Sequence, residues 1–108
     1  MQKTVTPADL DLDRLEALRG LFTPEELSSY YSALIDDITD FIQHGPSASA
    51  FFDQAHAQLG AALNLGALRI AGTLRAVEGR PVDLRQALDD LDDALVALRP
   101  ALERHGVT

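Results

Sequence analysis

The side chains in this sequence that are best suited to chemistry are three histidines, and cysteine is absent. The absence of cysteine excludes disulfides, thiol catalysis and cysteine-ligated zinc, and it favours a reducing compartment. Imidazole is partly unprotonated at cellular pH, so an accessible histidine can act as a nucleophile. His44 is interpreted as a helix-end residue favoured by the helix dipole, and His105 has no supporting pattern around it. The remaining histidine, His56, lies within the apolar segment from Phe51 to Leu65, where a lone histidine is more often an ordinary boundary residue than a reactive one.

The segment around His56 predicts an amphipathic helix with the histidine at the edge of its apolar face. Each residue advances about 100° around a helix, and the mean direction of the apolar residues lies about 90° from His56. These residues are Phe51, Phe52, Ala55, Leu59, Ala62, Leu63 and Leu65. Asp53 and Gly60 lie one turn before and after His56, on or beside the polar side. We therefore expect the imidazole to reach water, with Phe52 and Leu63 flanking it.

The run from Ala55 to Ala67 resembles the signature of the histidine phosphotransfer (HPt) domain family. The positions that match in register are Ala55, His56, Gly60, Ala61, Ala62, Asn64, Leu65, Gly66 and Ala67. Further along the chain, the residues similar to the family's next helix are Arg69, Ala71, Leu74 and Glu78. The resemblance implies an all-α fold, namely an antiparallel four-helix bundle with a short additional N-terminal helix.

The same resemblance implies a phosphorelay intermediate. His56 would accept a phosphoryl group from the receiver domain of a hybrid histidine kinase and pass it to a response regulator. The expected partner-docking residues are Phe52, Asp53, Leu59, Gly60, Leu63 and Asn64. Magnesium and its acidic ligands would belong to the receiver, so no cofactor is expected in this chain. The sequence lacks a Gly-rich phosphate loop and a lysine-bearing ATP loop, which favours a phosphoryl carrier over an autonomous kinase.

Two positions depart from the family pattern. Where the family has leucine followed by lysine, this chain has Gln58 followed by Leu59. Leu59 is about 60° from His56 around the helix, so we expect a lysine introduced there to increase the phosphate held on the imidazole. The departure leaves open a degenerate HPt-like module that binds a receiver or kinase without carrying phosphate. An unrelated helical-bundle adaptor also remains, and Phe52, Leu59 and Leu63 can equally be core residues.

Helix start and stop signals divide the first half of the chain. Thr6 and Pro7 predict a short first helix over about residues 7–20. Thr23 with Glu26 forms a capping-box pattern, and apolar residues then recur at spacings of three and four. This pattern predicts a long amphipathic helix that ends at His44.

The second half of the sequence predicts three more helices. Ser47 or Ser49 is expected to cap the third helix, which contains His56, and a shorter fourth helix follows. Asp83 is expected to cap the last helix, with Gln86 as its reciprocal partner. Pro100 is expected to bend this helix or end it early.

Length and composition predict one compact domain over residues 1–108. The net charge of −8 repels phosphate backbones and anionic lipid, so neither nucleic acid nor a membrane is an expected partner. Residues 1–6 lack the apolar run of a secretory signal, and we expect a cytoplasmic monomer. The acidic clusters are interpreted as a solvated outer face rather than a metal site. They comprise Asp36, Asp37, Asp40, Asp89, Asp90, Asp92 and Asp93.

Overall fold

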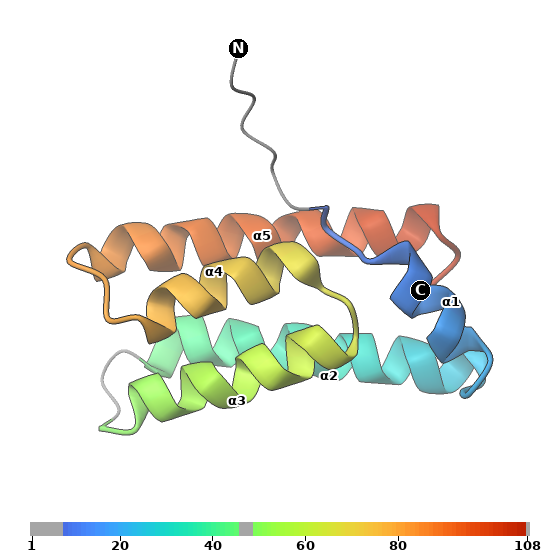
Figure 1. The fold of residues 1–108 in the computed structure, drawn as a ribbon, viewed down its shortest axis with the longest axis horizontal. Helices are drawn as coiled ribbons and strands as arrows, with labels where there is room; N and C mark the ends of the chain where they lie inside the picture. Colours follow the sequence, from blue (N-terminus) through green and yellow to red (C-terminus); the bar gives the residue numbers. More distant parts are fainter. Residues whose placement is uncertain (1–7, 46–48, 108) are drawn as a thin grey trace, which may run out of the picture.

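The computed structural model describes residues 8–45 and 49–107, and within these residues the chain is all-helical, with no β-strand (Figure 1). The helices are α1 (Leu12–Arg19), α2 (Pro24–His44), α3 (Phe51–Asn64), α4 (Leu68–Glu78) and α5 (Leu84–Arg104). The all-α fold class expected from the sequence is therefore confirmed.

The ends of α2 agree with the sequence prediction. The Thr23 hydroxyl accepts a hydrogen bond from the Glu26 backbone N–H, and the Glu26 carboxylate accepts one from the Thr23 N–H, at 3.1 and 2.9 Å. This capping box satisfies two backbone donors that would otherwise lack partners at the helix start. The helix then runs to His44, as predicted.

The starts of the other helices agree only in part. Helix α1 begins at Leu12 with Asp11 as its cap, so the predicted start at residue 7 is wrong; Thr6 and Pro7 lie outside the described residues. Helix α3 has Ala50 at its cap position with no side-chain cap, so Ser49 does not cap it. The alternative cap, at residue 47, lies outside the described residues.

Helix α5 begins as predicted but does not end early. Asp83 accepts a hydrogen bond from the Gln86 backbone N–H at 3.0 Å, whereas the Gln86 side chain bonds Asp90 instead of returning to the cap. The helix continues through Pro100 to Arg104. Proline costs a helix one backbone hydrogen bond, but the apolar face of α5 remains buried on both sides of it. Packing of that face offsets the local loss.

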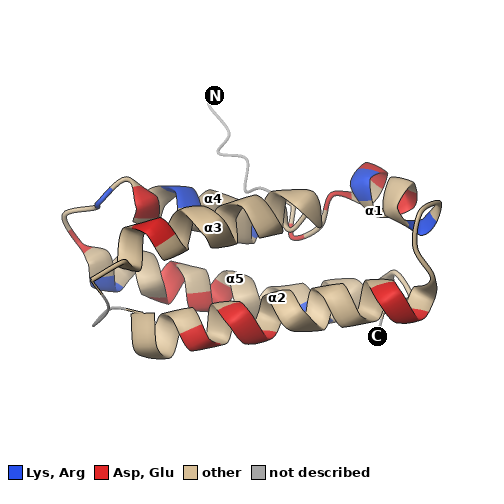
Figure 2. Cartoon of the chain, turned by 90° about the horizontal axis from the view of Figure 1, so that it is seen from below, with Lys and Arg blue, Asp and Glu red and all other residues tan. Residues whose placement is uncertain are grey.

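Consecutive helices from α2 to α5 run in opposite directions, with α1 at one end of the molecule (Figure 1). Helix α3 packs against α2 and α4, and α5 packs against α4 and α2, so the four helices enclose one core. Seen from below, α3 and α4 form one layer and α2 and α5 the other (Figure 2). The largest of the fully buried side chains in the core are Leu27, Tyr31, Ile38, Ile70, Leu74, Val77, Leu91 and Leu98.

The acidic clusters lie on the outside of the molecule. Figure 2 shows acidic residues along α2 and α5, with few basic residues among them. The seven aspartates of the two clusters are all exposed, which agrees with the predicted solvated face. No helix in the described part of the chain is long and apolar enough to cross a membrane.

Candidate functional site

His56 lies in the middle of α3 with its imidazole open to solvent. The side chain is 74% exposed, while Ala55 beside it is fully buried. Asp53 and Gly60, one turn before and after His56, are also exposed. The boundary position predicted from helical geometry is therefore the observed one.

The imidazole contacts a carboxylate of the next helix. His56 Nδ1 lies 2.5 Å from Oε1 of Glu78, the last residue of α4, and the Glu78 side chain is 32% exposed. An ionised carboxylate can only accept hydrogen bonds, so Nδ1 carries the proton of this contact. In the neutral ring, Nε2 then has the free lone pair. The contact with Glu78 therefore selects the tautomer whose free Nε2 has the lone pair that a nucleophile requires.

The turn between α3 and α4 brings the two helices together so that His56 and Glu78 meet. Gly66 in this turn has φ 70°, a left-handed conformation that L side chains rarely adopt, and a Cβ there would lie 3.0 Å from the Arg14 Cβ. The Asp11 N–H donates to the Gly66 carbonyl at 2.7 Å, and the Arg14 guanidinium donates to the Asn64 carbonyl at 2.8 Å. The segment around α1 thus secures the far end of the α3–α4 hairpin.

Helix α2 holds the same turn through Tyr31. The Tyr31 hydroxyl donates to the Leu65 carbonyl at 2.6 Å, and the residue is 1% exposed. Burial raises the pKa of Tyr31 to about 12, because the phenolate would lose its hydration, although Arg14 and Arg19 act in the opposite direction. The hydroxyl therefore remains a donor throughout the physiological pH range.

An arginine completes the surroundings of His56. Phe52, Asp53, His56, Glu78 and Arg80 line one open pocket. The Arg80 guanidinium carbon lies 4.8 Å from the centre of the Phe52 ring, in a cation–π contact. Sequence reasoning did not assign Glu78 or Arg80 to the site. The only available signal was the match of Glu78 to the family's following helix.

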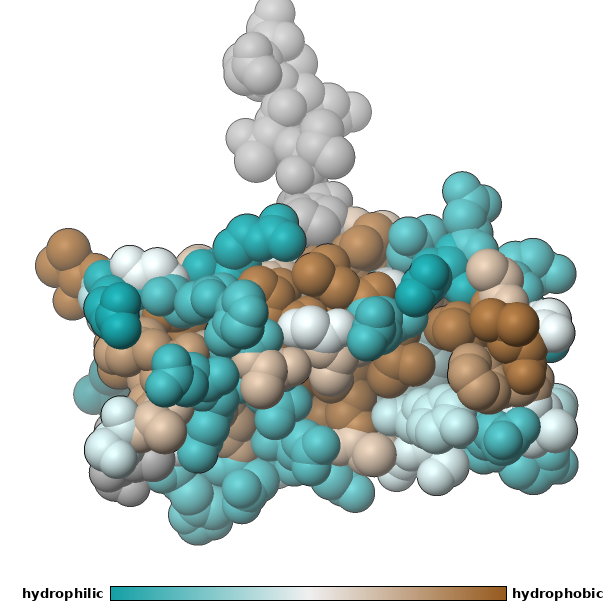
Figure 3. Space-filling model, turned by 60° about the horizontal axis from the view of Figure 1, so that its bottom comes forward, coloured by the Kyte–Doolittle hydropathy of each residue, from teal (hydrophilic) through white to brown (hydrophobic). Residues whose placement is uncertain are grey.

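Most of the expected docking residues are accessible. Asp53, Gly60 and Asn64 are exposed, Leu63 is 43% exposed, and Phe52 is half-buried. The face that includes α3 has apolar side chains in its middle, whereas its lower edge along α2 is largely hydrophilic (Figure 3). Leu63 and the half-buried Phe52 therefore offer apolar contact area on the same helix as His56.

Leu59, unlike the other expected docking residues, is buried. It is 7% exposed and belongs to the hydrophobic core, so it takes the alternative core role rather than the expected docking role. Gln58, one residue earlier, is half-buried. The expectation that a lysine at position 59 would reach a phosphoryl group from the surface needs correction, because that side chain starts inside the core.

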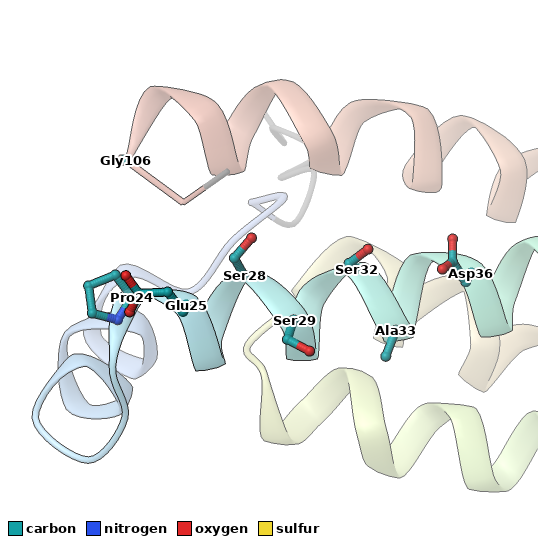
Figure 4. A pocket seen from close by; sticks show the side chains of 8 residues that line it. All are labelled: Pro24, Glu25, Ser28, Ser29, Ser32, Ala33, Asp36 and Gly106. Atoms are coloured by element: carbon teal, nitrogen blue, oxygen red, sulfur yellow. The ribbon is translucent and has the colours of Figure 1, made fainter.

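A larger groove lies away from His56, along α2 and the end of α5. Its lining includes Pro24, Ser28, Ser32, Asp36 and Gly106. The side chains of Ser28, Ser32 and Asp36 point toward α5, whereas Ser29 and Ala33 point to the other side of α2 (Figure 4). This groove lacks the imidazole–carboxylate pair, so reactive chemistry is better supported at His56. Among residues 8–45 and 49–107, no three His, Asp or Glu side chains come together as a candidate metal site.

Comparisons of the chain with protein-family models, with curated proteins and with solved structures found no match.

Proposed function

We propose that this chain is a histidine phosphotransfer protein of a multistep two-component phosphorelay, with His56 carrying the phosphoryl group between receiver-domain aspartates. The observation that carries the proposal is the exposed imidazole of His56 with its Nδ1 2.5 Å from the Glu78 carboxylate. The proposal includes the fold: α2 to α5 are an antiparallel four-helix bundle of the HPt kind, and α1 is the short additional helix. This assignment is supported by the packing of α2 on α3, α3 on α4, α4 on α5 and α5 on α2 around one hydrophobic core.

The transfer step needs no proton to enter or leave the attacking nitrogen. The Nε2 lone pair attacks the phosphorus of the receiver's aspartyl phosphate, the P–N bond forms, and the P–O bond breaks with its electrons staying on the aspartate. Nδ1 keeps its proton, so the phosphorylated ring carries a positive charge that faces the Glu78 carboxylate. In the onward step, the aspartate of the second receiver attacks phosphorus and Nε2 leaves with its lone pair.

The surface around His56 suits a docked receiver. Gly60 is exposed, and a Cβ built on it meets nothing within 4 Å, so this part of α3 leaves room for a partner. Leu63 adds exposed apolar area, while Asp53 and Asn64 add polar groups. The receiver would supply magnesium and the acids that bind it. This role places the protein in the cytoplasm, where receiver domains work.

The test is phosphoryl transfer from purified receiver domains of the same cell, loaded with labelled phosphate. Wild type should acquire acid-labile, base-stable label, and His56→Gln should acquire none while keeping its helical spectrum. His44→Gln is the matched control, because His44 is another exposed histidine at the end of α2. Label on His56→Gln equal to that on wild type would show that His56 is not the acceptor.

A second candidate function is a degenerate HPt-like module that docks on a receiver or kinase without carrying phosphate. One observation favours it: α3 contains no lysine or arginine, so the family's lysine has no counterpart on this helix. This alternative predicts receiver binding by wild type, with no label transferred from any loaded receiver that binds. Label on His56 rejects it.

A further inference from the structure

Arg80 occupies a backbone conformation that ordinarily favours glycine. It follows Gly79 at the end of α4 and has φ 55°, and in the described residues it is the one non-glycine residue with positive φ. Such a conformation costs a side-chain-bearing residue on the order of 1 kcal/mol. A glycine would remove this cost, so the arginine side chain has to contribute something that offsets it.

The Arg80 guanidinium contacts an aromatic ring, and its side-chain N–H donors have no hydrogen-bond partner among residues 8–45 and 49–107. It lies 4.8 Å from the centre of the Phe52 ring, and the Arg80 residue is exposed. Stacking on an aromatic ring uses the flat face of a guanidinium and leaves the N–H edge available. Arg80 forms no ion pair with any acid of residues 8–45 and 49–107. A positioned cation with unused donors therefore borders the pocket that contains His56.

The position of Phe52 brings this cation to the reactive side chain. Phe52 and His56 are four residues apart on α3, so their side chains are neighbours on one face of the helix. The carboxylates of Asp53 and Glu78 line the same pocket, and both repel a phosphoryl dianion. Among the five residues that line this pocket, Arg80 is the only one with a permanent positive charge.

We propose that Arg80 is the residue that binds the phosphoryl oxygens on phosphorylated His56, and that it takes this role from the turn after α4 in place of a lysine on α3. The inference rests on the proposed phosphotransfer function. The planar N–H edge of arginine matches two phosphoryl oxygens at once, which a single ammonium group does not. The Arg80 guanidinium lies over the Phe52 ring, and Glu78 holds the ring proton on Nδ1.

The experiment uses phosphoramidate, a small anion that phosphorylates histidine without a partner protein, on the full chain. Arg80→Gly removes the guanidinium and suits the left-handed backbone, so it avoids added strain. Arg80→Lys keeps the charge without the planar donor edge. Arg85→Ala is the control, because it removes the same charge from an exposed position on α5. Peptide mapping measures the ratio of phosphorylated to free His56 at steady state.

At low salt, Arg80→Gly should lower this ratio by about twofold to fivefold, as the loss of one exposed charged contact would. Arg80→Lys should lie between Arg80→Gly and wild type, Arg85→Ala should match wild type, and the differences should shrink as salt rises. Equal ratios in wild type and Arg80→Gly would overturn the role of Arg80, and so would an equal loss in Arg85→Ala. A parallel assay with labelled receivers separates the two proposals. If wild type accepts no label from any loaded receiver, the proposed phosphotransfer function is contradicted. If wild type and Arg80→Gly accept and retain the label equally well, only the role of Arg80 is contradicted.

Discussion

Leu59 and His56 are three residues apart on α3, yet Leu59 is 7% exposed and the His56 side chain is 74% exposed. The boundary between core and solvent runs between them. A charge introduced at residue 59 therefore begins in the core, whereas a charge introduced at Ala57, which is exposed, begins in water.

This relationship predicts that Leu59→Lys destabilises the fold by about 2–5 kcal/mol, because it removes a core side chain and brings an ammonium group close to apolar neighbours. Ala57→Lys, the exposed control, should change stability by less than about 0.5 kcal/mol. Denaturant unfolding followed by circular dichroism measures both. If Leu59→Lys is as stable as Ala57→Lys and also increases the phosphate on His56, the lysine side chain has reached the surface. That outcome would contradict the expectation that a lysine at residue 59 is confined by the core.

The second prediction concerns the carboxylate that holds the His56 ring proton. Glu78→Gln should slow phosphoryl acceptance by about threefold to tenfold, because the amide oxygen still accepts from Nδ1 but carries no charge, and a charged hydrogen bond is stronger than a neutral one by about 1 kcal/mol. Its effect on stability should stay below about 1 kcal/mol, since the pair is partly exposed. The rate of phosphoryl acceptance is measured by mixing each variant with a labelled receiver and quenching the reaction at set times. Glu103→Gln, an exposed glutamate near the end of α5, is the control, and equal rates in the two variants would contradict the role given to Glu78.

The third prediction separates docking from folding at Gly60. Gly60→Arg should weaken receiver binding by bulk, while the isolated domain becomes more stable by about 0.5–1 kcal/mol, because glycine is a poor helix former and a Cβ added at this position meets no neighbour within 4 Å. Val96→Arg, on α5, adds the same group at a site that is 67% exposed. Calorimetric binding and thermal unfolding test the two effects. Receiver affinity reduced equally in both variants would point to added charge rather than to obstruction beside His56.

The fourth prediction concerns pH and the Tyr31 hydroxyl. A tyrosine has a pKa of about 10 when unfolded, and burial raises that of Tyr31 to about 12, so the folded state favours the neutral phenol. Its contribution to stability is complete below about pH 10 and is lost as pH rises toward 12, by roughly 2–3 kcal/mol in total.

Tyr31→Phe supplies the control for this pH dependence. It should cost about 1 kcal/mol at neutral pH, because the Leu65 carbonyl loses its donor. Above about pH 10 the difference between wild type and Tyr31→Phe should shrink and then reverse. Denaturant unfolding from neutral pH to about pH 11 measures it, and a constant difference over that range would mean that Tyr31 does not couple ionisation to folding.

The sequence by itself determined the features that depend on neighbouring residues. The capping box of Thr23 and Glu26, the end of α2 and the edge position of His56 all follow from the order of residues along a single helix. The sequence did not identify the start of α1, because the cap signal at Thr6 and Pro7 is as good locally as the one at Asp11. It also left open whether α5 ends early at Pro100, and the helix continues to Arg104 because burial of the apolar face overrides the local preference.

Only the tertiary structure decided what surrounds His56. Glu78 is 22 residues away along the chain and reaches Nδ1 because the turn at Gly66 folds α4 back along α3. Arg80 reaches Phe52 for the same reason. Helical periodicity could not settle Leu59, since a residue about 60° from a boundary position can face the core or the solvent. The packing of α3 against α2 and α4 places Leu59 in the core, because the direction in which neighbouring helices lie is a property of the assembled fold and not of one helix.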